Sequence, residues 1–136
     1  MAIARKFGDL VYKWHVPTLL DMARDLPIRE TPTDRFNLDV DAWFGEACKP
    51  TIENVVDHME RINGANLEDP ILLSAEGHVF DGLHRLAKCK LLKITTIKYK
   101  QFAFNPEPFE TEDFDEFKRN RPLIADTLVW MEKNLL

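Results

Sequence analysis

Residues 70–102 constrain the fold most, because they predict four elements in a definite order. Ile71–Ser74 and His78–Phe80 are short apolar runs separated by Ala75–Gly77, a turn that contains glycine, and this arrangement predicts a β-hairpin. Leu83–Leu92 consists mostly of good helix formers with its apolar residues on one face. Ile94–Phe102 is rich in β-branched and aromatic residues, which favour a strand. The predicted order is strand, strand, helix, strand.

This order predicts an α+β fold with a small mixed sheet flanked by helices. A second helix is predicted from Pro50, because apolar residues recur at helical spacing through Ile62 and Gly64 lies where a C-terminal cap belongs. We expect that helix to pack on the core. The connection from Phe80 to Thr95 passes through one helix, so it should be a crossover, and right-handed if its strands are parallel.

The remaining segments are predicted more simply. Val16–Ala23 is predicted to be a short helix with proline in its first turn. Residues 27–41 are predicted to be loop or extended chain. Asp39 or Asp41, at the end of that segment, could cap a helical turn through Trp43 and Phe44. We expect the three tryptophans to fill the core. Thr111–Phe117 reads as the start of a helix with acids in its first turn. Leu123–Leu135 predicts an amphipathic C-terminal helix, whose docking on its own sheet is favoured over binding to a partner.

Length and composition indicate one domain over residues 1–136, with a core at 50–105 and an acidic helical C-terminal extension at 106–136. The longest uncharged apolar runs fall far short of the roughly 20 residues that a bilayer span needs, and residues 1–10 lack the apolar core of a signal peptide. We therefore expect a cytoplasmic protein with no membrane partner. Cys48 and Cys89 should be unpaired in that reducing compartment.

The charge distribution is uneven. The net charge is −5, but residues 82–105 contain no acid and six lysines or arginines, which leaves −11 for the remainder. A basic segment on an acidic background permits a small anionic ligand or a local nucleic-acid contact.

The junction Asp81–Arg85 has the chemistry of an anion site. Glycine between a strand and a helix lets a ligand approach the backbone closely, and the first N–H groups of the helix point outward with the favourable end of its dipole. Arg85 offers a planar fork for phosphate. Asp81 either caps the helix, binds a metal that travels with a nucleotide, or handles a proton. The predicted site comprises Asp81 and His84 as catalytic residues and, as phosphate or nucleotide ligands, Gly82, Leu83, His84, Arg85 and Lys88.

The turn Asp81-Gly82-Leu83-His84-Arg85 in this context resembles the ParB/sulfiredoxin-like superfamily, over about thirty residues. The resemblance implies that superfamily's fold and a nucleotide-binding turn. Sulfiredoxins place their reactive cysteine where this chain has Leu83, so their usual activity is excluded. Chromosome-partitioning ParB proteins bind a cytidine nucleotide but carry a helix-turn-helix domain after the turn. Only about thirty residues remain here for such a domain, and their net charge is negative. The similar turn of free serine kinases, Asp-Gly-His-His-Arg, matches except at Leu83, and by position Glu30 is the candidate for their additional carboxylate.

Two functions are open at this stage. The first is a protein that binds a nucleotide, with Mg²⁺ as its companion ion, or another phosphate ligand, and that acts as a phosphotransferase or phosphohydrolase if it is an enzyme. The second is a non-enzymatic adaptor or regulator that binds a protein through the C-terminal helix, or DNA through Lys88–Lys100. His78, Asp81 and His84 are spaced by three, but a strand places the first two on opposite faces, so no structural zinc is predicted.

Overall fold

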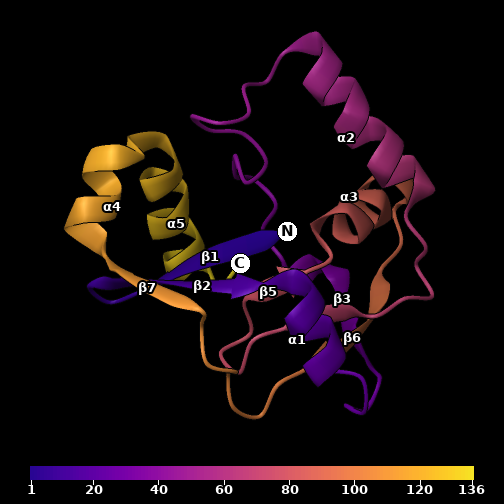
Figure 1. Ribbon diagram of the computed structural model, residues 1–136. Helices are drawn as coiled ribbons and strands as arrows, with labels where there is room; N and C mark the ends of the chain where they lie inside the picture. Colours follow the sequence, from indigo (N-terminus) through magenta and orange to yellow (C-terminus); the bar gives the residue numbers. More distant parts are fainter.

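Seven strands form two small sheets in the computed structural model, which describes residues 1–136 (Figure 1). The first sheet is antiparallel and has the order β1-β2-β7; its strands are β1 (Ala2–Phe7), β2 (Leu10–His15) and β7 (Glu110–Asp113). The second has the order β3-β6-β4-β5; its strands are β3 (Arg29–Pro32), β4 (Ile71–Leu73), β5 (Val79–Asp81) and β6 (Thr96–Gln101). β4 is parallel to β6 and antiparallel to β5, so the second sheet is mixed.

Five α-helices accompany the sheets. They are α1 (Val16–Met22), α2 (Ile52–Gly64), α3 (Leu83–Leu92), α4 (Phe114–Asn120) and α5 (Pro122–Asn134), and a single 3₁₀ turn covers Thr33–Arg35. The protein therefore has the predicted α+β class, arranged as one domain. No helix combines the length and the apolar character that crossing a membrane requires.

The predicted order of strand, strand, helix, strand is confirmed. β4 and β5 form the hairpin, α3 follows, and β6 returns next to β4. The connection from β5 through α3 to β6 passes over β4, so it is a crossover. β5 and β6 run antiparallel, since each is oriented oppositely with respect to β4, and the handedness rule for parallel strands does not apply to them.

The predicted helix start at Thr111 is wrong, because Glu110–Asp113 pairs with β2 as strand β7. Lys13 on β2 explains the pairing, since its ammonium group lies 3.0 Å from the carboxylate of Glu110 and 2.9 Å from that of Glu112. Opposite charges on neighbouring strands stabilise the pair, although β7 has no apolar residue to bury. The helix begins only at Phe114, after Asp113 accepts a hydrogen bond from the amide of Glu116 as its cap.

Helix α2 corrects two further predictions. Its cap is Thr51, whose hydroxyl accepts from the Asn54 amide, so the helix starts after Pro50 rather than at it. It also does not pack on the core along its length. Only Ile62 is buried, while the other apolar residues of the stripe are exposed: Ile52, Val55, Val56 and Met59. In Figure 1 this magenta helix stands apart from the sheets, and its packing is mainly against α3.

The segment between β3 and α2 contains no α-helix. The expected helical turn at Trp43 and Phe44, capped by Asp39 or Asp41, is absent, and residues 36–51 are irregular after the 3₁₀ turn. Trp43 does not belong to the buried core, in contrast to Trp14.

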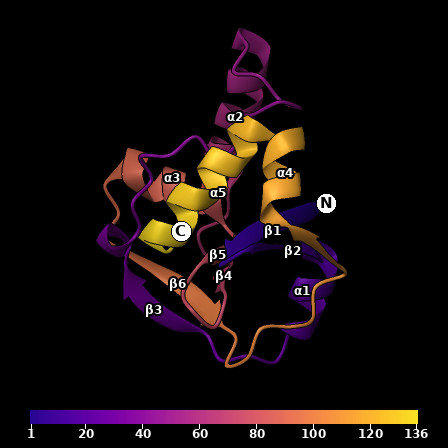
Figure 2. The same cartoon turned by 90° about the vertical axis from the view of Figure 1, so that its left-hand side faces the viewer.

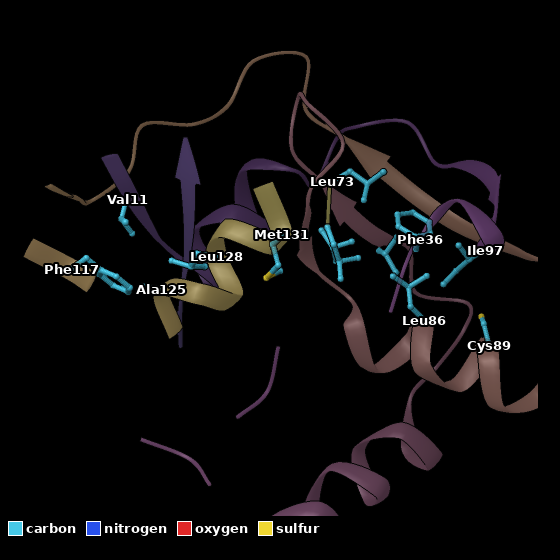
Figure 3. Close-up of a cluster of buried hydrophobic side chains, with 13 residues drawn as sticks. Val11, Phe36, Leu73, Leu86, Cys89, Ile97, Phe117, Ala125, Leu128 and Met131 are labelled. Carbon is cyan, nitrogen blue, oxygen red and sulfur yellow. The ribbon is translucent and has the colours of Figure 1, made fainter. Parts of the chain in front are cut away.

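The largest cluster of buried side chains connects the two sheets. Figure 3 shows Val11 of β2 with Phe117 and Leu128 at one end, Met131 in the middle and Ile97 of β6 at the other. α5 supplies a large part of this cluster and lies against β1 (Figure 2). Residues 106–136 are therefore part of the fold rather than an appended extension. The apolar face of α5 is buried, so this helix docks on its own domain, the outcome that its pattern favours.

Candidate functional site

A cavity of about 510 Å³ opens where α3 begins. Its wall includes four consecutive residues of the predicted turn, Asp81–His84, which the end of β5 and the start of α3 position. The other walls come from β1, the irregular segment 42–48, the inner side of α2 and the face of α5. The predicted turn therefore lies in a concave part of the surface.

Gly82 makes the junction between strand and helix possible. Its φ of +126° is a conformation that residues with a side chain rarely adopt. A Cβ atom here would lie 2.7 Å from the Cβ and 3.2 Å from the Cα of Ile71, and it would also overlap that residue's Cγ2. The backbone of Gly82 therefore packs directly on β4, and no other residue type fits without a shift.

The N-terminus of α3 has no capping side chain. The carbonyl of Gly82 accepts a hydrogen bond from the Leu86 amide at 3.0 Å, and this bond joins the junction to the first turn of α3. The amides of Leu83 and His84 precede it, and the first amides of a helix have no partner within the helix. The helix dipole adds positive potential at the same end, so the start of α3 has the properties of an anion site.

Asp81 does not cap the helix. Its carboxylate instead accepts a hydrogen bond from Arg85 at 2.8 Å, and the same guanidinium donates to the carbonyls of Asp69 and Pro70. Arg85 thereby fastens the loop before β4 to the start of α3. Lys88 is similarly engaged, since its ammonium donates to the carbonyls of Asn63 and Ala65 at the end of α2. Neither basic residue is among those that line the cavity.

Two other arginines line the cavity, Arg5 of β1 and Arg61 of α2. Arg5 is only 7% exposed, and it donates to the carbonyls of Ala4 and Val79 while its Nε has no partner. No carboxylate forms an ion pair with it. Burial lowers the pKa of Arg5 to about 10, which leaves it charged at neutral pH. The cavity thus has a buried cation with no counter-charge.

Trp43 covers a pair of histidines at the cavity wall. Nδ1 of His58 and Nε2 of His84 lie 2.8 Å apart, so one imidazole donates to the other. The indole ring stacks on both imidazoles, with centroids 4.6 Å from His58 and 4.5 Å from His84 and interplanar angles of 7° and 5°. These contacts connect the irregular segment to both α2 and α3.

The two histidines are uncharged at neutral pH. Burial lowers the pKa of His84 to about 4, helped by the neighbouring His58 and by Arg61. Burial also lowers the pKa of His58, again with a contribution from Arg61. A single shared N–H···N hydrogen bond between neutral rings is consistent with these directions. Positive charge at the cavity therefore comes from the arginines rather than from the histidines.

The structure brings together Asp81, Gly82, Leu83 and His84 but directs Arg85 and Lys88 to the protein's own carbonyls. Glu30 lies on β3 opposite Lys98, outside the cavity. Arg5, Trp43, His58 and Arg61 were not predicted. His58 and Arg61 are three residues apart, which places both on one side of α2, and this spacing could have indicated that they belong to one site. The sequence around Arg5 and Trp43 does not indicate that they reach the site, because a strand brings Arg5 there and an irregular segment brings Trp43.

His78 occupies a different position from the cavity histidines. It is only 2% exposed, packs edge-on against Phe7, and has an Nδ1 with no hydrogen-bond partner. Burial, followed by the charge of Arg5, lowers the pKa of His78. No group of three His, Cys, Asp or Glu side chains is arranged to hold a metal ion. Cys48 and Cys89 are free thiols.

Side chains of the basic segment bond largely to the protein itself. Lys98 pairs with Glu68, and Lys100 donates to the carbonyls of Ala23 and Arg24. With Lys88 and Arg85 engaged as well, four of the six cations have partners within the fold. Only Arg85 and Lys98 pair with a carboxylate, so the charges of the other four are not balanced by an ion pair.

Comparisons with known protein families, with curated proteins and with solved structures find no match for this chain. The resemblance to the ParB/sulfiredoxin-like superfamily remains a prediction that depends on the turn and its neighbouring elements.

Proposed function

We propose that this protein binds a small phosphate-bearing ligand, such as a nucleotide, at the N-terminus of α3. The observation that supports the proposal most is Arg5, a buried cation without a carboxylate partner on the wall of the same cavity as the uncapped helix. An unpaired buried charge is unfavourable by several kcal/mol, and an anion in the cavity would offset that cost. The amides at the start of α3 would donate to the same anion.

The electrostatic balance of the cavity favours an anion. Arg5 and Arg61 contribute two positive charges to the wall, and Asp81 is the one carboxylate there. That carboxylate is already paired with Arg85, so it repels a phosphate less than a free aspartate would. The proposed ligand contacts are the backbone of Gly82, Leu83 and His84 together with the two cavity arginines.

Binding, rather than phosphoryl transfer, is the function that this geometry supports. Asp81 and His84, the two predicted catalytic residues, have side-chain partners in Arg85 and His58. Phosphoryl transfer requires that the phosphate be positioned and that its charge be neutralised. A Mg²⁺ ion that accompanied a nucleotide would supply part of that neutralisation. Asp81 is the residue on the cavity wall that would contact such an ion.

A thermal-denaturation series tests the proposal. Inorganic phosphate and ATP are each titrated with and without Mg²⁺, against sodium chloride at matched ionic strength. At one hundred times its dissociation constant a ligand stabilises the folded state by about 2.7 kcal/mol. Arg61→Gln should weaken the response, whereas Arg24→Gln, which removes an exposed arginine that does not line the cavity, should not.

The outcome that contradicts the proposal is equally clear. If neither phosphate nor ATP stabilises the protein beyond the chloride control, the cavity is not a phosphate site. The same holds if Arg61→Gln and Arg24→Gln reduce the response equally, because the effect would then be a general one of surface charge.

A further inference from the structure

A second cavity, of about 540 Å³, lies beside the proposed phosphate site. Ten of its eleven lining residues are hydrophobic, and they come from segment 38–43, α2, α3 and the last residue of the chain. Met59 of α2 and Leu83, Lys90 and Leu91 of α3 are among the lining residues. A volume of this size falls in the usual range for small-molecule sites.

The two cavities share part of their walls. Ala42, Trp43 and Leu83 line both, so they are adjacent across these three residues. Leu83 connects the two environments most directly, because its amide belongs to the start of α3 while its side chain packs with the apolar residues. One ligand can therefore reach an anion site and an apolar site at the same time.

The apolar cavity selects the chemistry of the ligand's second part. A nucleobase presents donors and acceptors along its edge, whereas this wall offers only two side-chain donors, Lys90 and the indole N–H of Trp43, and no side-chain acceptor. Polar groups that lose water without gaining partners oppose binding, whereas a hydrocarbon has none to lose. Met59 and Leu91 are 42% and 54% exposed, so a hydrocarbon would also remove protein apolar surface from water.

We propose that the ligand is an amphiphilic phosphate monoester, whose phosphate lies at the start of α3 and whose hydrocarbon chain lies in the apolar cavity. The proposal depends on the phosphate site proposed above and specifies its ligand class. The positive charge of Arg5 and Arg61 matches the head group, and the adjoining apolar wall matches the chain. Because an apolar wall adjoins the anion site at Leu83, the two cavities fit an amphiphile better than a nucleotide.

Chain-length dependence measured by calorimetry tests this directly. The probes are inorganic phosphate and butyl, hexyl and octyl phosphate, each below its micellar concentration, with octanol as the uncharged comparison. Each methylene that enters the cavity should tighten binding about fourfold. Met59→Glu places a charge in the cavity and should abolish this gain, while lowering the affinity for inorganic phosphate no more than Val56→Glu does. Val56→Glu is the matched control, since Val56 is half-exposed on the same helix and does not line either cavity.

The possible results separate the two proposals. A gain with chain length that is lost in Met59→Glu and kept in Val56→Glu supports the amphiphile. Phosphate binding with no gain from the chain overturns the amphiphile and leaves the phosphate site standing. A gain that survives Met59→Glu also overturns it, because the chain then lies elsewhere. Octanol binding as tightly as octyl phosphate, or no binding by any probe, overturns both.

Discussion

The substitution Gly82→Ala tests the physical basis of the strand–helix junction. The added methyl group meets two obstacles, a φ of +126° and a Cβ that would lie 2.7 Å from the Cβ of Ile71. Backbone strain of this kind costs about 1–3 kcal/mol, and overpacking against a filled core costs about 1–3 kcal/mol more. The free energy of unfolding should therefore fall by roughly 2–6 kcal/mol, the sum of those two ranges. Urea denaturation followed by circular dichroism measures it.

The matched control is Gly64→Ala at the end of α2, where an added Cβ would have no neighbour within 4 Å and φ is not positive. Alanine is a better helix former than glycine, so this variant should gain about 0.5–1 kcal/mol. Adding Ile71→Ala to Gly82→Ala removes the overlap with Cγ2 but keeps the backbone strain and the close approach to the Cβ of residue 71. The double variant should therefore lose somewhat less stability than the sum of the losses of the two single variants. If Gly82→Ala loses less than about 1 kcal/mol, below the strain range alone, the account of this junction is wrong.

Three other predictions follow from single contacts. The unfolded chain protonates His84 near its ordinary pKa of 6.5, whereas the folded protein holds that pKa at about 4. The free energy of unfolding of the wild type should therefore fall as the pH drops from 6.5 towards 4. Urea titrations should show a smaller fall for His84→Phe. Arg85→Gln should lose about 1.5–3 kcal/mol of stability, because its donors serve the Asp69 and Pro70 carbonyls. Its phosphate affinity in calorimetry should fall less than that of Arg61→Gln, because Arg85 acts on the ligand only through its ion pair with Asp81. Ile62→Ala should lose about 2–4 kcal/mol in urea titrations whereas Val56→Ala, on the exposed stripe of α2, should change stability by less than about 0.5 kcal/mol.

The segment around α3 could be predicted because its local signals agree with one another. Apolar runs, a glycine turn and a run of helix formers all point to the same elements, and the structure has them within a residue or two. The first sheet was missed for the opposite reason. The buried position of β1 is Arg5, a charge that breaks the apolar alternation of a strand, and β7 has no apolar residue at all. Their pairing depends on partners distant in the sequence, such as Lys13 with Glu110.

Helix α2 was predicted correctly but its packing on the core was not, because periodicity reveals an apolar face without showing what covers it. The stripe from Ile52 to Met59 has helical spacing, yet most of it is exposed. The site was predicted only in part for a related reason. Asp81–His84 form a local turn that the sequence displays, whereas Arg5, Trp43 and Arg61 reach the cavity from three separate segments. Only the fold brings those segments together.

The most direct measurement of the central claim is a phosphate titration followed by ¹⁵N NMR. If the start of α3 and the buried arginine form the phosphate site, the amide signals of Gly82, Leu83 and His84 and the Nε–H signal of Arg5 should shift together and saturate with one dissociation constant. Sodium chloride at equal ionic strength should not move them. Shifts confined to exposed lysines such as Lys90 and Lys93, with the Arg5 and Gly82 signals unmoved, would contradict the claim.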